Sequence, residues 1–238
     1  MSSKQILQPS QHYLEIAKQA SITLKEPRKQ LLILDLNGTL VSRVKGGGSM
    51  FVRPFSNLFF DYIFDHFTVM VWSSAQPHSV NFMCRMFGSH RSKLALVWDR
   101  TSFGLSIEEY SRKTATIKDL NKVWQRLEEF DATNTILLDD SSSKTVLQPF
   151  NVIHPTEFIH GSSSFRSSGE CELIQIIDYL KVLRYQSNVA NYIMNNPFKS
   201  IFNHQLNSFK VLHFIKSEQD GYEIDFNYIK PSNQHIRF

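Results

Sequence analysis

Polar side chains suited to chemistry on a phosphate group stand at four places where apolar segments of the chain end. Asp35, Ser73 and the pair Asp139 and Asp140 each directly follow an apolar run, and Lys118 opens an amphipathic segment. A carboxylate can bind Mg²⁺ through hard oxygen ligands and can attack phosphorus, while hydroxyl and ammonium groups stabilise phosphoryl oxygens. A single Asp or Ser after a strand is ordinarily a helix cap, but four such positions in this order indicate phosphoryl chemistry.

The residue types suggest a role for each position. Asp35 is the predicted nucleophile and a metal ligand, and Asp140, with Asp139 beside it, completes the metal site. Ser73 donates to a phosphoryl oxygen, and Lys118 neutralises the charge that develops during transfer. The sequence therefore predicts Mg²⁺-dependent attack on a phosphate monoester.

The elements that must position these residues alternate between strands and helices. Apolar runs predict strands buried on both faces at residues 31–34, 67–72, 94–98 and 135–138. Amphipathic spacing predicts helices after Arg53-Pro54, over residues 80–87, over residues 116–126 and over residues 173–183. This alternation predicts an α/β fold with an open parallel sheet, right-handed crossovers and helices on both faces. Ligands of such sheets bind outside the carboxyl ends of the strands.

Ordered motifs give the chain a family resemblance. Asp-Leu-Asn-Gly-Thr-Leu at residues 35–40 resembles the first motif of the haloacid dehalogenase (HAD) superfamily, residues 71–75 its second and residues 137–141 its fourth. Arg53-Pro54, Trp98-Asp99-Arg100 and Lys118-Asp119-Leu120 are similar to the branch of RNA polymerase II C-terminal-domain phosphatases and NLI-interacting-factor-like domains. The resemblance covers roughly residues 30–187 and is greatest to a fungal subgroup with Asn in the first motif. It implies a HAD-like, Rossmannoid phosphatase domain.

The resemblance also implies roles for individual residues. Asp35 accepts the phosphoryl group, and Mg²⁺ is bound by Asp35, the backbone carbonyl of Asn37, and Asp140 with Asp139 beside it. Ser73 and Lys118 hold phosphate, with Lys113 as the alternative to Lys118, and Thr39, Ser74 and Arg100 bind substrate.

Asn37 departs from the pattern of active phosphatases in this branch, which have an aspartate there as general acid and base. An amide gives no proton at neutral pH and accepts none, and the loss of such a group typically slows turnover about 10²- to 10⁴-fold. The metal ligand survives, because it is a main-chain oxygen. His78 and His154 are candidates to replace the missing acid, although exposed loop histidines are commonly without a catalytic role.

The chain divides into three predicted regions. Residues 1–29 form a helical extension, residues 30–187 the phosphatase-like domain, and residues 188–238 a C-terminal appendage. Residues 46–49 have the composition of a flexible glycine-serine linker, which predicts an engineered replacement of a longer loop. Arg43 and Lys45 are interpreted as solvated residues that flank this loop.

Composition narrows the class of protein. The chain has 238 residues, 42% of them hydrophobic, and its two cysteines, Cys84 and Cys171, have neither disulfide nor metal-binding spacing. No apolar run is long enough to span a membrane and residues 1–11 lack a signal-peptide core, so we expect an intracellular protein, nuclear or cytoplasmic rather than mitochondrial. The net charge of +4 does not by itself imply nucleic-acid binding, which stays an open alternative although the chain has no motif for it.

Two functions are compatible with these features. The first is a Mg²⁺-dependent phosphatase that acts on phosphoserine or phosphothreonine of a protein and is slow because of Asn37. The alternative is a catalytically inactive HAD-fold module that binds a protein partner.

Overall fold

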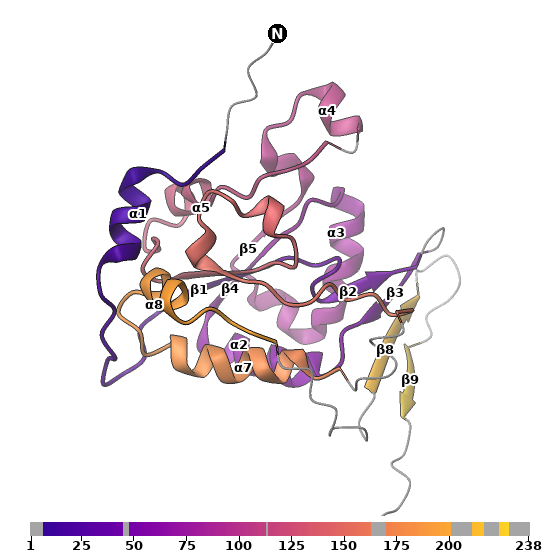
Figure 1. Ribbon diagram of the computed structural model, residues 1–238. Helices are drawn as coiled ribbons and strands as arrows, with labels where there is room; N and C mark the ends of the chain where they lie inside the picture. The colour runs from indigo at the N-terminus through magenta and orange to yellow at the C-terminus, as the bar shows by residue number, and fades with distance from the viewer. Residues whose placement is uncertain are drawn as a thin grey trace, which may run out of the picture.

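The core of the protein is a five-stranded parallel sheet with the strand order β5-β4-β1-β6-β7 (Figure 1). The computed structural model describes residues 7–44, 48–112, 114–162 and 170–200, together with the backbone of residues 211–216 and 224–228. The strands are β1 (Leu31–Leu34), β4 (Thr68–Trp72), β5 (Leu96–Trp98), β6 (Thr135–Leu138) and β7 (Val152–Ile153). All four neighbouring pairs are parallel, as the sequence predicts.

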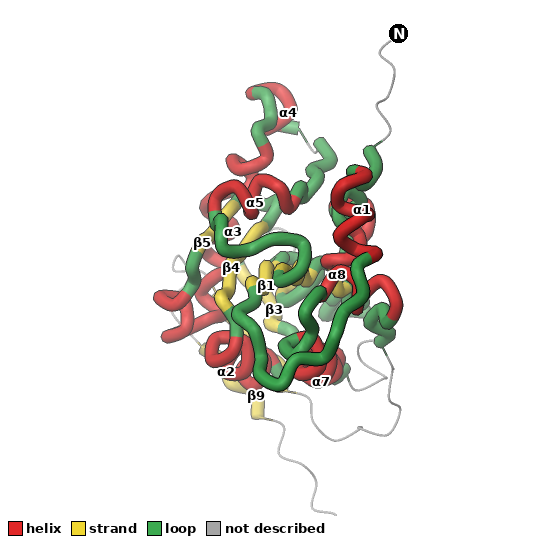
Figure 2. Tube along the Cα trace, turned by 90° about the vertical axis from the view of Figure 1, so that its left-hand side faces the viewer, coloured by secondary structure: helices red, strands yellow, loops and turns green. Residues whose placement is uncertain are grey.

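The sheet is covered on both faces because its strands are apolar on both sides. In β1, Leu32 and Leu34 pack into one hydrophobic cluster, whereas Leu31 and Ile33 pack into a second. The first cluster holds apolar residues of α2 (Ser56–His66), α3 (Pro77–Met83) and α7 (Glu172–Leu183), and the second holds those of α5 (Leu120–Arg126). Figure 2 shows the sheet between α5 on one side and α2 and α7 on the other. The predicted α/β class with helices on both faces is confirmed.

Element boundaries differ from the prediction where local geometry interrupts the periodic pattern. The segment predicted as one helix over residues 80–87 is α3 followed by the 3-10 segment η1 (Cys84–Lys93), in which Gly88 has a φ of 53°. The helix predicted from residue 116 begins at Leu120, because Asp119 caps it by accepting from the backbone N–H of Asn121. Strand β7 was not predicted, since two residues are too short to show a period.

A second, antiparallel sheet has the order β2-β3-β8-β9 and lies at one edge of the molecule (Figure 1). Its strands are β2 (Val41–Arg43), β3 (Ser49–Val52), β8 (Val211–Lys216) and β9 (Ile224–Tyr228). Lys45, Gly46 and Gly47 lie outside the described residues, and Ser49 is the first residue of β3. The engineered replacement of a loop at residues 46–49 stays a prediction. β8 and β9 both fall within residues 188–238, the predicted C-terminal appendage.

The terminal regions pack on the same body. In α1 (Gln11–Lys18), the Ser10 side chain caps the helix by accepting from the backbone N–H of Tyr13. The side chain of Asn191 in α8 (Val189–Asn195) donates to the carbonyl of Ala17 at 2.8 Å. The remaining elements are η2 (Arg100–Phe103), α4 (Ile107–Ser111), η3 (Ser142–Lys144) and η4 (Pro149–Asn151).

Two further sequence features can be compared with the structure. Cys84 and Cys171 are both buried, and neither forms a disulfide. Among the described residues, no helix combines the length and the apolar character that crossing a membrane requires.

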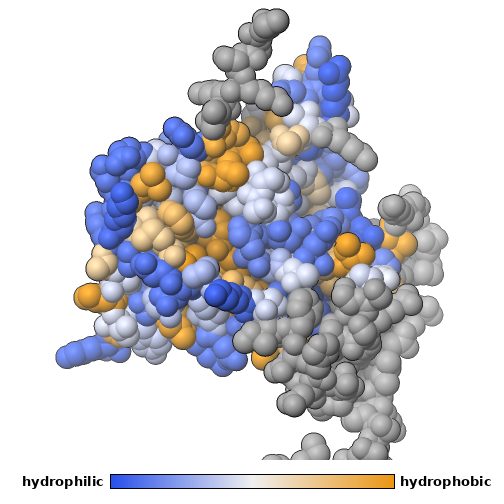
Figure 3. Space-filling view, in the orientation of Figure 1, coloured by the Kyte–Doolittle hydropathy of each residue, from blue (hydrophilic) through white to orange (hydrophobic). Residues whose placement is uncertain are grey.

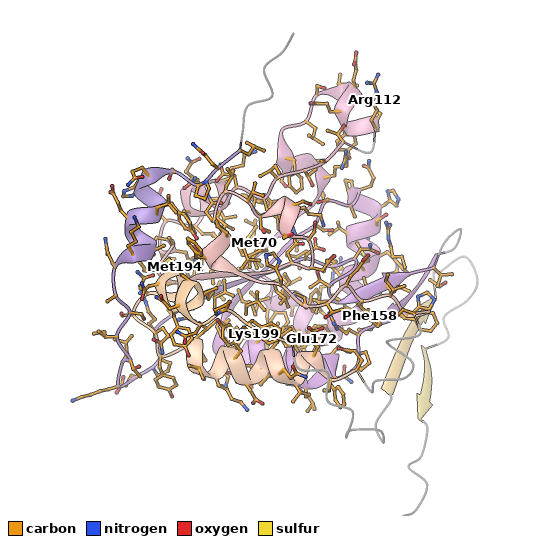
Figure 4. All side chains as sticks on the ribbon, viewed as in Figure 1. Met70, Arg112, Phe158, Glu172, Met194 and Lys199 are labelled. Atoms are coloured by element: carbon orange, nitrogen blue, oxygen red, sulfur yellow. The ribbon has the colours of Figure 1, made fainter. Side chains whose placement is uncertain are left out.

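A buried ion cluster joins the hairpin to the start of α7. The Arg53 side chain is 2% exposed; it donates to the carbonyl of Thr39 at 2.9 Å and to Glu170 at 3.1 Å, and it also pairs with Glu172. Glu172 in turn accepts the backbone N–H of Thr156 at 3.0 Å. Figure 4 shows Glu172 at the end of α7 that faces the hairpin. Because Arg53 lies between two buried carboxylates, its charge is needed to offset their desolvation.

Replacing Arg53 with the similarly sized, uncharged Met should therefore destabilise the protein by about 3–5 kcal/mol, since two buried carboxylates lose their partner. Urea unfolding followed by circular dichroism measures this change. Lys181→Met, which removes a pair with Asp178 on the exposed face of α7, is the control and should leave the unfolding midpoint unchanged. Equal midpoints for the two variants would contradict the prediction.

Candidate active site

The acidic residues meet because of the register between β1 and β6. Leu34 pairs with Leu138 at the ends of these parallel strands, so the following residues, Asp35 and Asp139, leave the sheet side by side. The backbone N–H of Asp35 donates to the carbonyl of Leu138 at 2.9 Å, which extends the ladder to the first acidic residue. The side chains of Asp35 and Asp139 are both buried. They form the floor of the candidate site.

Lys118 lies completely buried between these two carboxylates. Its Nζ donates to Oδ1 of Asp35 at 2.8 Å and to Oδ2 of Asp139 at 2.6 Å. Burial lowers the pKa of Lys118, but the two carboxylates raise it by more, so its net pKa shift is upward and the side chain stays an ammonium group. Burial raises the pKa of Asp35, and Lys118 offsets part of that increase. Lys113, the alternative to Lys118, lies outside the described residues.

Asp140 is oriented by the loop that follows β1. The Thr39 hydroxyl donates to Oδ1 of Asp140 at 2.7 Å, accepts the backbone N–H of Asp140 at 3.1 Å, and lies 3.5 Å from Oδ2 of Asp35. Gly38 has a φ of 91°, and a Cβ there would lie 3.0 Å from each carboxylate oxygen of Asp140. The loop therefore needs a glycine at this position for its backbone conformation and for space. Thr39 is buried and orients Asp140, and its contact with substrate stays a prediction.

The donor set of the acidic cluster fits a hard divalent cation. One oxygen from each of Asp35, Asp139 and Asp140 lies within 4.8 Å of the others, and carboxylate oxygens are the ligands that Mg²⁺ prefers. Nζ of Lys144 lies 3.8 Å from Oδ1 of Asp139, so three carboxylates face two ammonium groups and negative charge remains in excess. Because Asp139 already pairs with both lysines, Asp35 and Asp140 have more oxygen capacity for a cation.

Ser73 and Ser74 border the acidic cluster at the end of β4, the neighbour of β1 on the other side. The Ser73 backbone N–H donates to the carbonyl of Trp98 at 2.9 Å, and its hydroxyl accepts the N–H of Ala75 at 3.3 Å, which leaves the hydroxyl proton for another acceptor. The Ser74 hydroxyl is 2.7 Å from that of Thr116, so it ties this turn to the segment that leads to Lys118.

Arg100 holds the backbone beside this turn. Its guanidinium is buried and donates to carbonyl oxygens of Ser74, Glu109, Tyr110, Arg112 and Thr114 at 2.8–3.4 Å. These contacts anchor α4, the helix that projects at the top of Figure 1, to the sheet. These carbonyl oxygens occupy the donors of Arg100. The predicted contact of Arg100 with substrate is not tested by these contacts and stays a prediction.

Asn37 is exposed, in contrast to Asp35, and its side chain contacts Arg43 at the end of β2. Nε of Arg43 donates to Oδ1 of Asn37 at 3.1 Å, and Nη1 of Arg43 donates to the hydroxyl of Ser79 in α3 at 3.3 Å. The interpretation of Arg43 as a solvated flank is therefore incomplete: it is exposed, yet it bridges the loop after β1 and the helix after β4.

The two candidate histidines differ in their surroundings. His154 is exposed and its Nδ1 is 2.7 Å from the carbonyl oxygen of Asp139, so this ring nitrogen donates to the backbone under the acidic cluster. His78 is exposed near the start of α3. Trp72 packs edge-on against Trp98 at a ring distance of 5.2 Å within the second hydrophobic cluster.

Sequence reasoning missed two cations that contact predicted site residues. Lys144 approaches Asp139 from a position in η3 that is 25% exposed, and Arg43 contacts Asn37. In Figure 3, hydrophilic side chains gather beside the β2–β3 hairpin, on the side toward which the parallel strands run. The spacing Asp-Asp-Ser-Ser-Ser-Lys at residues 139–144 was the available signal for Lys144, because a lysine one turn after an acidic pair returns to it.

The chain is similar to known proteins over most of its length. A family model described as NLI interacting factor-like phosphatase matches residues 30–190. An uncharacterized FCP1 homology domain-containing protein of Schizosaccharomyces pombe is 36% identical over 213 residues, which cover 81% of this chain and 86% of that protein. Ubiquitin-like domain-containing CTD phosphatase 1 of Drosophila melanogaster is 22% identical over 169 residues, which cover 68% of this chain and 52% of the fly protein. The solved structure of Fcp1, an essential RNA polymerase II CTD phosphatase, aligns at a TM-score of 0.42 and 15% identity over 75% of this chain and 57% of Fcp1.

The space beside Gly38 gives a test of how the acidic cluster is held. Gly38→Ala should lower the free energy of unfolding by about 2–4 kcal/mol, because a positive φ and a contact with Asp140 are both unfavourable. Gly104→Ala is a matched control, since Gly104 also has a positive φ of 68° but its Cβ would meet nothing closer than 4.0 Å. The control should cost about 1–2 kcal/mol, the strain alone. Equal losses in urea unfolding would show that Asp140 moves freely.

Proposed function

The chain belongs to the NLI interacting factor-like phosphatase family, and on this premise we propose that it is a Mg²⁺-dependent phosphatase-like protein that acts on phosphoserine or phosphothreonine of a protein partner. The observation that carries the proposal is the buried Asp35–Lys118–Asp139 triad with Asp140 beside it. This arrangement combines a nucleophile, a fixed positive charge and a cation site at one strand edge.

Asp35 is the proposed phosphoryl acceptor. Lys118 holds its Oδ1, so Oδ2 is the oxygen directed to phosphorus or to a cation. Attack forms an oxygen–phosphorus bond to Asp35 and breaks the bond to the leaving oxygen, and the same ammonium group reduces the charge that builds up on the transferred group. Ser73 is the proposed donor to a phosphoryl oxygen, because its hydroxyl accepts from the N–H of Ala75 and keeps its own proton for another acceptor.

The cation site consists of Asp35, Asp140 and the backbone carbonyl of Asn37, with Asp139 beside them. When bound, Mg²⁺ supplies positive charge next to the phosphoryl oxygens. Thr39 orients Asp140 toward this site, and Gly38 leaves the space that the carboxylate occupies.

Asn37 makes the proposed enzyme slow. Its amide neither protonates a leaving oxygen nor removes a proton from water, so both the first step and the hydrolysis of the aspartyl-phosphate lack general acid–base help. This feature also favours a second candidate function, in which the same fold binds a phosphorylated protein without turning it over. We propose a nuclear or cytoplasmic location for either function.

Mg²⁺ binding is testable without activity. Isothermal titration calorimetry should detect binding to the wild-type chain and at least about tenfold weaker binding to Asp140→Asn, because one charged ligand is lost. Asp178→Asn removes an exposed carboxylate from α7 and should bind as the wild type does. Equal affinities of all three proteins would refute the ligand assignment.

Restoring the acid tests turnover. Asn37→Asp should raise the rate of hydrolysis of an activated aryl phosphate by roughly 10²-fold or more, because the carboxyl group protonates the leaving oxygen and then activates water. The same substitution in an Asp35→Asn background should have no effect, since the nucleophile is absent. Activity that stays at background in Asn37→Asp while Mg²⁺ binds would favour the non-catalytic module.

A further inference from the structure

We propose that Lys144 is a second phosphate-binding residue of the candidate active site, which contacts the phosphate dianion of the substrate while Lys118 holds Asp35 and Asp139. This inference rests on the function proposed above and deepens it, because it names a further residue that contacts phosphoserine or phosphothreonine. It applies to a catalytic site and to a non-catalytic module alike, since both bind the phosphate group.

Lys118 has little donor capacity left for a phosphate group. An ammonium group has three N–H donors, and Lys118 gives one to Asp35 at 2.8 Å and one to Asp139 at 2.6 Å. At most one N–H is therefore left for a phosphoryl oxygen. The Lys118 side chain is also completely buried, so a ligand in solvent cannot contact it before entering the site.

The ammonium group of Lys144 is close to the acidic cluster but is not hydrogen-bonded to it. Its Nζ lies 3.8 Å from Oδ1 of Asp139, beyond the range of about 2.7–3.2 Å for an N–H···O bond. That oxygen already accepts the backbone N–H of Ser141 at 2.8 Å. Among the described residues, Asp139 is the only carboxylate that pairs with Lys144, and none accepts a hydrogen bond from its Nζ. The three N–H donors of Lys144 are therefore available to a ligand.

Lys144 and Lys118 lie at opposite oxygens of one carboxylate. Lys118 contacts Oδ2 of Asp139, and Lys144 is nearest to Oδ1. Burial raises the pKa of Asp35, whereas the charges of Lys118 and, more weakly, Lys144 act to lower it, so the charge of Lys144 reaches the proposed phosphoryl acceptor. A phosphate group bound at Asp35 is therefore within reach of the field of both lysines, and the flexible stem of Lys144 lets its ammonium group adjust to that ligand.

The backbone of Lys144 is fixed, whereas its side chain reaches solvent. Its carbonyl accepts the backbone N–H of Lys118 at 2.8 Å, and its own N–H donates to the carbonyl of Ser141 at 3.1 Å. The Lys144 side chain is 25% exposed, whereas that of Lys118 has no exposed surface. Of these two lysines, only Lys144 can contact a phosphate group that is still in solvent.

The alternative role for Lys144 is to offset the charge of Asp139. Asp139 is already hydrogen-bonded at both oxygens, to Lys118 and to the backbone of Ser141, so it does not require a third donor. Three carboxylates against two ammonium groups also leave the empty cluster negative, and a dianion that enters it needs direct contact with positive charge. These observations favour a contact between Lys144 and the ligand.

Phosphate binding tests this role without requiring turnover. Isothermal titration calorimetry of the full chain in saturating Mg²⁺ measures its affinity for inorganic phosphate and for a phosphoserine peptide. Lys144→Gln should bind both at least about tenfold more weakly than the wild type, because a charge-assisted contact is lost. Lys144→Arg keeps a charge and donors, and its affinities should stay within about threefold of the wild type.

Two controls accompany this measurement. Lys181→Gln removes an exposed ammonium group that pairs with Asp178 on α7, and it should bind phosphate as the wild type does. Mg²⁺ alone should bind Lys144→Gln at least as tightly as the wild type, because a positive charge beside the carboxylates is gone. The hydrogen bonds that hold this turn use the backbone of Lys144, so we expect the variant to fold.

The outcomes separate this proposal from the function on which it rests. Phosphate affinities of Lys144→Gln equal to those of Lys181→Gln would overturn the role of Lys144 and leave the phosphatase-like function standing. Such equal affinities together with a lower urea unfolding midpoint would assign Lys144 to the support of Asp139 instead. Absence of binding of either phosphate ligand to the wild-type chain would overturn the proposed function and this proposal together.

Discussion

The fold is organised around one buried ammonium group that two strand ends must reach. Lys118 contacts Asp35 and Asp139 at hydrogen-bond distance, and none of the three side chains has appreciable access to water. Removing charges from water is costly, and the cost is recovered only where geometry is favourable and each charge has its partners. A shift of one residue in the register of Leu34 with Leu138 would separate the two carboxylates from the lysine. The ion pairs of Lys118 therefore require both the parallel register of β1 with β6 and the position of the turn before α5.

A second buried charge, the guanidinium of Arg53, links the loop after β1 to the hairpin. Arg53 binds the carbonyl of Thr39, and Thr39 orients Asp140, so the loop after β1 is held from the hairpin side as well as from the sheet. The backbone N–H of Phe158 donates to the carbonyl of Gly38 at 2.6 Å, which adds a third support from the segment before α7. Held in this way, the loop presents Asp140 in one orientation before a ligand arrives, and such preorganisation is what electrostatic catalysis requires.

Sequence reasoning located what depends on local pattern and missed what depends on contacts between distant segments. The strands at residues 31–34 and 135–138 were predicted to the residue, because continuous apolar runs end abruptly at charged residues. Lys118 could be placed at the sheet edge because the order of elements brings it there. The sheet formed by β2, β3, β8 and β9 joins segments more than 150 residues apart. The hydrophobic pattern within a segment does not indicate which distant strand it pairs with. The interpretation of Arg43 as a solvated flank was incomplete for the same reason, since its partners Asn37 and Ser79 come together only through the fold.

The contrast between buried and exposed residues bears on whether this site is used. A buried set of ion pairs is weak evidence for stability, because apolar replacements of similar volume are often neutral or stabilising. The Asp35–Lys118–Asp139 triad is therefore better explained by a ligand that needs its charges than by the needs of the fold. A phosphate group needs the ammonium of Lys118, and a divalent cation needs the excess of carboxylates around it. Asn37, by contrast, is exposed, and among the described residues its side chain hydrogen-bonds only to Arg43. An amide in place of a carboxylate at this position therefore removes the proposed acid and base and leaves the acidic cluster unchanged.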